Sequence, residues 1–132
     1  MDPVVHFELP YDNRERMARF YEAAFGWKLQ MYGEEMGNYV LATTAEADVM
    51  PEGKGHRGAI NGGFFPRSAD MPAQHPSVVI GVKDIQASMK AVKQAGGEVL
   101  GTPMEIPGVG QYVAFYDTEK NRLSMLQPLM SS

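Results

Sequence analysis

The feature that most constrains the fold of this chain is an internal repeat of its strand and helix pattern. The stretch from His6 to Gly26 has the pattern of a strand, a capped helix and a terminating glycine. The stretch from Ser77 to Gly97 repeats that order at the same separation, and three strand-like segments follow each helix. Repetition of a supersecondary unit indicates a fold built from copies of it. We therefore expect an α+β domain made of two strand-helix-strand-strand-strand modules.

The first module is expected to cover about residues 1–66. Its first segment, 4–9, alternates like a strand that ends at Pro10 and places His6 and Glu8 on the same face. Asp12 is expected to start an amphipathic helix that ends at Gly26. Its apolar stripe consists of Met17, Phe20, Tyr21 and Ala24. The strands that follow are expected at 27–32, 38–44 and 58–65, with a long loop of the kind that is often functional at 45–57.

The second module is expected to cover about residues 73–132, after a proline-rich linker at 66–76. Asp84 caps its helix, and Gly96 and Gly97 end it. The buried stripe of that helix consists of Ile85, Met89 and Val92. The strands of this module are expected at 77–82, 98–102, 111–116 and 122–127.

Length and charge exclude several classes of function. A chain of 132 residues is long enough for one domain with a hydrophobic core, so residues 1–132 are expected to form a single domain. The net charge is −4 and no Lys/Arg cluster is present, which argues against nucleic-acid binding. No apolar run is long enough to span a bilayer and no export signal opens the chain, so we expect a cytoplasmic protein without a membrane partner. The absence of cysteine excludes thiolate metal ligands and a cysteine nucleophile.

Three segments resemble the vicinal oxygen chelate superfamily, which includes glyoxalases, bleomycin-resistance proteins and extradiol dioxygenases. They are VVHFELPYDNRERMARFYEAAFGWKL, GVKDIQASMKAVKQAGGEV and IPGVGQYVAFYDTEKNRLSMLQP. The central GAINGGFFPR resembles a glyoxalase-like subgroup of unassigned function. The resemblance implies two βαβββ modules that form a cupped, mainly antiparallel eight-stranded sheet with the helices outside. It also implies a homodimer.

The resemblance further implies four positions that hold a divalent metal ion in the enzymes of the superfamily. These positions fall on His6, on the strand around 61–63, on Ser77 and on Ser124, and only His6 is a competent ligand. Serine hydroxyls lack both the charge of a carboxylate and the basicity of an imidazole. We therefore expect no metal cofactor. The alternative is a rearranged site for Zn, Ni, Mn or Fe that uses His6 with Glu8 and His75.

His6 and Glu8 are the candidate catalytic residues. A carboxylate on a partly desolvated face has a raised pKa, which suits a general base. The alternatives are that His6 is an ordinary hydrogen-bonded histidine and that Glu8 is solvated or paired with Arg67.

The candidate ligand-binding residues are expected on three strands. Adjacent glycines weaken a strand, so a ligand or another backbone is expected to approach them closely. An aromatic wall with a guanidinium suits an apolar ligand that carries an acidic or carbonyl group. The residues are Asn61, Gly62, Gly63, Phe65, Arg67, Tyr112 and Ser124.

Three functions of different class follow from these patterns. The leading interpretation is a protein that binds a small aromatic or carbonyl compound in the cavity of the sheet, with a degenerate metal site. The first alternative is a divalent-metal lyase, isomerase or dioxygenase that uses a rearranged site. The second is a non-catalytic interaction module.

Overall fold

The computed structural model describes residues 1–45, 58–70 and 74–129. They form two helices and one eight-stranded mixed sheet with the strand order β2-β3-β4-β1-β5-β8-β7-β6. The chain divides into two compact units, one of His6–Pro76 and one of Met1–Val5 with Ser77–Ser132. None of the described helices is long and apolar enough to cross a membrane. The predicted long loop at 45–57 lies almost wholly outside the described residues.

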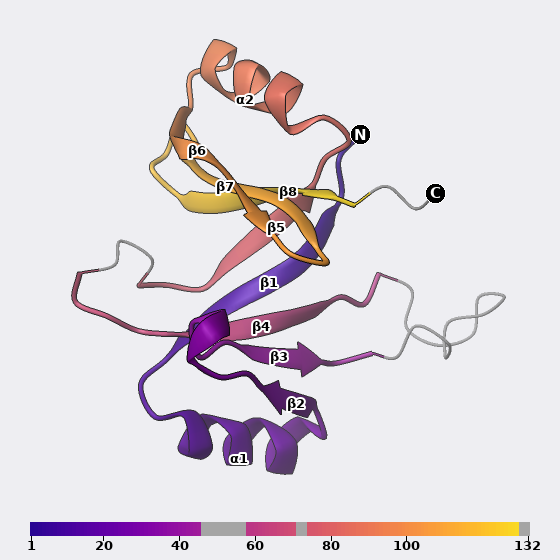
Figure 1. Ribbon diagram of the computed structural model, residues 1–132, viewed down its shortest axis with the longest axis vertical. Helices are drawn as coiled ribbons and strands as arrows, with labels where there is room; N and C mark the ends of the chain where they lie inside the picture. The colour runs from indigo at the N-terminus through magenta and orange to yellow at the C-terminus, as the bar shows by residue number, and fades with distance from the viewer. Residues whose placement is uncertain (46–57, 71–73, 130–132) are drawn as a thin grey trace, which may run out of the picture. The chain divides into compact units, whose positions relative to one another are not determined.

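The unit His6–Pro76 contains α1 and four paired strands (Figure 1). β1 pairs in parallel with β4, β4 pairs antiparallel with β3, and β3 pairs antiparallel with β2. A short 3₁₀ turn, η1, precedes β3. The elements are β1 (Val4–Tyr11), α1 (Arg14–Phe25), β2 (Lys28–Met31), η1 (Glu34–Met36), β3 (Val40–Thr43) and β4 (Asn61–Pro66).

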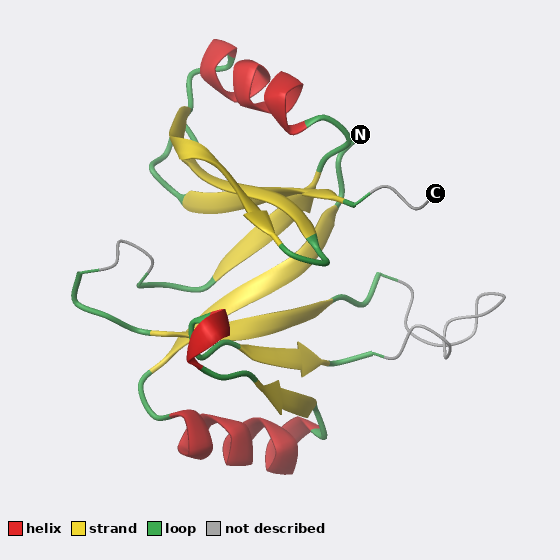
Figure 2. Cartoon of the chain, viewed as in Figure 1, coloured by secondary structure: helices red, strands yellow, loops and turns green. Residues whose placement is uncertain are grey.

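The second unit repeats this topology with α2 (Figure 2). β5 pairs in parallel with β8, β8 pairs antiparallel with β7, and β7 pairs antiparallel with β6. The predicted α+β fold of two βαβββ modules is therefore confirmed. The elements are β5 (Ser77–Gly81), α2 (Ile85–Gln94), β6 (Glu98–Ile106), β7 (Gly110–Tyr116) and β8 (Arg122–Pro128).

Each helix covers one face of the strands of its own unit, and that face forms the core. In the first unit Val40, Ala42 and Phe64 are almost fully buried, and Tyr21 and Trp27 pack against them. In the second unit the core consists of Val82, Ile85, Met89, Val113, Phe115 and Met125.

Several predicted boundaries were wrong for identifiable reasons. β1 continues through Pro10, because proline removes one donor and the Tyr11 carbonyl still accepts from Arg67 N at 2.8 Å. The N-cap of α1 is Asn13, whose Oδ1 accepts from Arg16 N at 2.9 Å, and not Asp12. β6 extends to Ile106 because an edge strand tolerates a proline, with a register irregularity after Leu100.

The predicted stripe of α1 was wrong in part. Phe20 is 58% exposed and Ala24 is also exposed, while Met17 and Tyr21 contact the core and Ala18 is buried. The helix is therefore rotated so that its buried face centres near Ala18. The predicted stripe of α2 is confirmed, since Ile85 and Met89 are buried and Val92 packs against them.

Candidate functional site

A set of polar and aromatic side chains shares the sheet face of the first unit that is opposite to α1. In the parallel pairing of β1 with β4, His6 lies beside Asn61, Glu8 beside Gly63 and Pro10 beside Phe65. Residues paired in this way project to the same side of a sheet. Phe7 and Phe64 project to the other side, into the core. We call the side with His6, Glu8, Tyr39, Gly63 and Phe65 the His6 face.

The central contact of the His6 face joins His6 to Tyr39. Nε2 of His6 and the hydroxyl oxygen of Tyr39 lie 2.9 Å apart in a half-buried hydrogen bond. Burial lowers the pKa of His6 below the ordinary value, because desolvation disfavours the charged imidazolium. The imidazole is therefore neutral at neutral pH, with one nitrogen that donates and one that accepts.

Tyr39 was not predicted from the sequence to belong to the site. The sequence did contain a signal for its position, because the residues Tyr39-Val40-Leu41-Ala42-Thr43 alternate between the two sides of a strand. Val40 and Ala42 are fully buried against α1, so the odd-numbered residues belong to the His6 face. The predicted strand included this segment, but its two faces were not assigned.

The structure places Glu8 on the same face as His6, half-buried and level with Gly63. A carboxylate two positions from a neutral imidazole is suited to accept a proton or a hydrogen bond from a bound molecule. Its role as a general base stays a prediction.

Side chains, and not backbone, account for the two adjacent glycines. A Cβ at Gly62 would fall on the ring of Phe7, and a Cβ at Gly63 would fall on the phenol of Tyr39. Neither glycine has a left-handed backbone, so each is needed for space alone. Asn61 has a local structural function, since its Oδ1 accepts from the backbone N–H groups of Thr44 at 2.7 Å and Ala45 at 2.9 Å.

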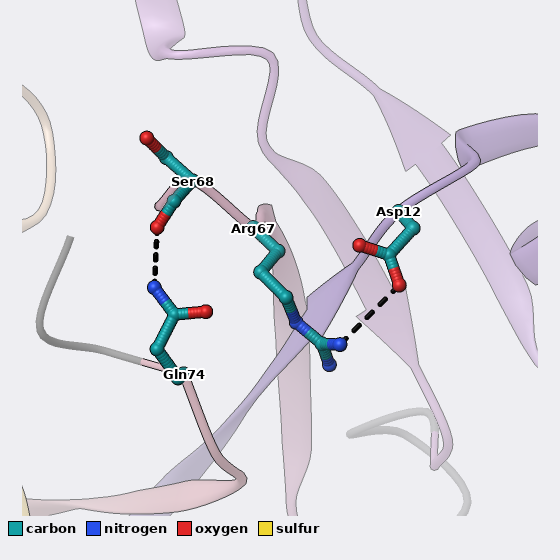
Figure 3. Close-up of polar contacts among 4 residues, drawn as sticks. All are labelled: Asp12, Arg67, Ser68 and Gln74. Carbon is teal, nitrogen blue, oxygen red and sulfur yellow. Dashed lines mark hydrogen bonds and ion pairs between the residues drawn. The ribbon is translucent and has the colours of Figure 1, made fainter. Parts of the chain in front are cut away.

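Arg67 lies after the end of β4 and forms an ion pair with Asp12 (Figure 3). The two charged groups are 3.3 Å apart, and their side chains are 41% and 60% exposed. The same segment is held by Gln74, whose side-chain amide donates to the Ser68 carbonyl oxygen. Arg67 thus forms its ion pair with Asp12 at the surface and not with Glu8, the partner given above as an alternative.

The second unit holds Tyr112 and Ser124 together. Ser124 is fully buried, and its hydroxyl donates to the hydroxyl of Tyr112 at 2.6 Å. Ser124 lies level with Ala114 on β7 and with Val79 on β5. The two hydroxyls are therefore hydrogen-bonded to each other within the second unit.

The described side chains do not offer a divalent ion the ligands that it requires. The described residues contain no group of three or more His, Asp or Glu side chains that could hold a metal. Nε2 of His6 is hydrogen-bonded to a phenol and the hydroxyl of Ser124 to another, while His75 is exposed at the approach to β5. Catalytic metal sites use about three ligands with strong N, O or S donors. The described donors do not fit this requirement.

The comparison with protein families gives a match over nearly the whole chain. The sequence profile of the Glyoxalase/Bleomycin resistance protein/Dioxygenase superfamily matches residues 4–125. A glyoxylase-like domain-containing protein of Didymella fabae is 30% identical over 117 residues, which are 86% of this chain and 84% of that protein.

Solved structures share the fold at low sequence identity. A hypothetical protein of Bacillus halodurans has a TM-score of 0.70 at 14% identity, covering 99% of this chain and 97% of that one. Methylmalonyl-CoA epimerase from Mycobacterium tuberculosis has a TM-score of 0.69 at 11% identity, covering 96% and 88%. The repeated modules, the topology and the profile match together show that this chain belongs to the Glyoxalase/Bleomycin resistance protein/Dioxygenase superfamily.

Proposed function

We propose that this protein binds a small, neutral aromatic or carbonyl compound on the His6 face without a metal ion. The observation that carries the proposal is the half-buried hydrogen bond between His6 and Tyr39, on the same face as Glu8. Small-molecule sites are mostly apolar with a few placed polar groups. Phe65 and Leu41 supply apolar surface on this face, and the imidazole and phenol supply the polar groups.

The charges of the unit favour a neutral ligand over an acid. His6 is neutral because burial lowers its pKa, and Glu8 on the same face repels an anion when it is ionised. The guanidinium of Arg67, which was predicted to bind an acidic group, pairs with Asp12 at the surface. A carbonyl oxygen needs only a hydrogen-bond donor, which a neutral imidazole provides.

The structural neighbours support a carbonyl compound as the ligand. A methylmalonyl-CoA epimerase has been solved in complex with methylmalonyl-CoA and NH4+, and its TM-score to this chain is 0.67. The ligand of that protein is a thioester, which carries a carbonyl group; it also carries anionic groups, so the comparison bears on the carbonyl and not on the charge. The same fold can therefore hold such a group.

We propose that the site works without a metal because the expected ligand positions offer weak or occupied donors. Only His6 provides an imidazole, and its Nε2 is hydrogen-bonded to Tyr39. Any proton transfer on this face is then assigned to Glu8, with His6 as its partner. Homodimerisation and a cytoplasmic location remain proposals that rest on the family resemblance and on the sequence.

Three ligands of nearly equal shape test this proposal. Acetophenone carries a neutral carbonyl, benzoate a charge and ethylbenzene no acceptor. Ligand-observed NMR titrations should give the tightest binding for acetophenone. Loss of one hydrogen bond of about 1 kcal/mol weakens affinity about 5-fold, so ethylbenzene should bind about 5-fold more weakly.

Two variants test whether the ligands bind on the His6 face. His6→Gln should weaken acetophenone binding by a similar factor and leave ethylbenzene unchanged, since only the carbonyl uses the imidazole. Glu8→Gln should reduce the difference in affinity between acetophenone and benzoate, because it removes the negative charge that repels benzoate. Equal affinities for all three ligands, or no effect of either variant, would refute the proposed site.

A further inference from the structure

The two modules place a tyrosine at equivalent positions relative to their second-last strands, β3 and β7. Tyr39 comes immediately before Val40, which lies level with Phe64. Tyr112 comes immediately before Val113, which lies level with Met125. Leu41 then lies level with Gly63 and Ala114 with Ser124. Gly63 and Ser124 are therefore equivalent residues in the two modules.

The two tyrosines have different partners because the equivalent residues differ. In the second unit the Tyr112 hydroxyl meets the Ser124 hydroxyl at 2.6 Å. In the first unit the equivalent residue has no side chain, and the phenol of Tyr39 occupies the space that a Cβ of Gly63 would need. The hydroxyl of Tyr39 reaches past β4 to the next strand, where it bonds Nε2 of His6 at 2.9 Å.

We infer that Tyr39 is a positioning residue for His6 and that Gly63 is the residue that admits it. This inference rests on the proposed function of the His6 face. Tyr39 donates its hydroxyl proton to Nε2, because a phenol is a better donor than acceptor and an imidazole nitrogen is a good acceptor. The proton of the neutral ring then lies on Nδ1, and Nδ1–H is the donor that His6 offers to a carbonyl ligand.

The inference specifies a tautomer, which a purely structural hydrogen bond does not require. Nitrogen-15 NMR of the imidazole rings reads the tautomer directly, and the chain has only three histidines, so His6→Gln assigns the His6 signals. The native protein at neutral pH should show an unprotonated Nε2 and a protonated Nδ1. Tyr39→Phe keeps the ring, removes the donor and should shift the population toward Nε2–H.

Gly63→Ser tests the function of the glycine by copying the arrangement of the second unit. The new hydroxyl should capture Tyr39 as Ser124 captures Tyr112, and the His6 tautomer should change as in Tyr39→Phe. Gly62→Ala is the matched control. Its added methyl group meets Phe7 on the opposite face, so it perturbs packing and should leave the His6 tautomer as it is.

Ligand binding distinguishes this inference from the proposed function. Tyr39→Phe should weaken acetophenone binding about 5-fold, as expected for the loss of one well-placed hydrogen bond. If His6→Gln weakens binding and Tyr39→Phe does not, the site stands and the positioning function of Tyr39 is wrong. If acetophenone does not bind the native protein, the proposed function fails. A protonated Nε2 in the native protein, or a tautomer that Tyr39→Phe leaves unchanged, would overturn the inference.

Discussion

Gly63→Ala should destabilise the protein only while Tyr39 is present. The added methyl group would overlap the hydroxyl oxygen and two ring carbons of Tyr39, so the phenol must move. Overpacking of this kind costs about 1–3 kcal/mol. Displacement of the phenol also breaks its bond to His6, which contributes about 1 kcal/mol. Replacement of a strand glycine by alanine by itself stabilises the folded state by about 0.5–1 kcal/mol. The net expected loss is about 2 kcal/mol.

The same substitution in a Tyr39→Ala background should be neutral or slightly stabilising, because the neighbour that it meets has been removed. The gain from replacing glycine is the same in both backgrounds and cancels, so the double-mutant cycle should give a coupling free energy of about 3 kcal/mol. Urea unfolding gives the free energy of unfolding of the native protein, the two single variants and the double variant. The fluorescence of Trp27, the single tryptophan, reports on this unit, because the ring centroids of Trp27 and Tyr21 are stacked 4.7 Å apart. An equal cost of Gly63→Ala in both backgrounds would refute the reasoning.

Three further predictions concern the stability of the folded protein. Burial lowers the pKa of His6 in the folded protein, so the unfolded chain binds a proton first as the pH falls. The free energy of unfolding should therefore be unaffected by His6 above about pH 6.5 and should decrease below that pH. Below about pH 6.5, the slope of the free energy of unfolding against pH should be smaller in His6→Gln than in the native protein, by at most about 1.4 kcal/mol per pH unit. An unchanged slope would contradict the conclusion that the buried imidazole of His6 is neutral. EDTA should not change the melting temperature and added Zn²⁺ should not raise it, whereas a rise with Zn²⁺ would restore the metal alternative. Ser124→Ala removes the hydrogen bond that the Ser124 hydroxyl donates to Tyr112 and should lower the free energy of unfolding by about 1 kcal/mol. Ser77→Ala at the start of β5 serves as the control.

The fold was largely predictable because its signals are local and repeated. Glycine ended α1 as expected, since Gly26 adopts the left-handed conformation with φ of 71°. Asp84 capped α2 as expected, with its Oδ1 accepting from Ala87 N at 3.1 Å. The cap of α1 was misplaced by one residue because Asp12 and Asn13 are both good caps. In the structure Asn13 accepts the capping hydrogen bond and Asp12 pairs with Arg67, which is distant in sequence.

The candidate site was less predictable because it depends on contacts between strands. Alternation along β1 placed His6 and Glu8 on one face, but the partner of His6 is 33 residues away on another strand. The adjacent glycines Gly62 and Gly63 predicted the close approach of a ligand or another backbone, whereas the side chains of Phe7 and Tyr39 occupy that space. The sequence did not identify aromatic side chains as the approaching groups, because the register of β4 with β1 and β3 is a tertiary property.

The central claim is that the His6 face binds a neutral carbonyl compound without metal. The most direct test is an acetophenone titration of EDTA-treated protein, followed through the backbone amide signals. We predict saturable shifts at His6, Glu8, Tyr39 and Gly63, with affinity unchanged when Zn²⁺ is added. Saturable shifts confined to other residues, or binding that appears only after Zn²⁺ is added, would contradict the account.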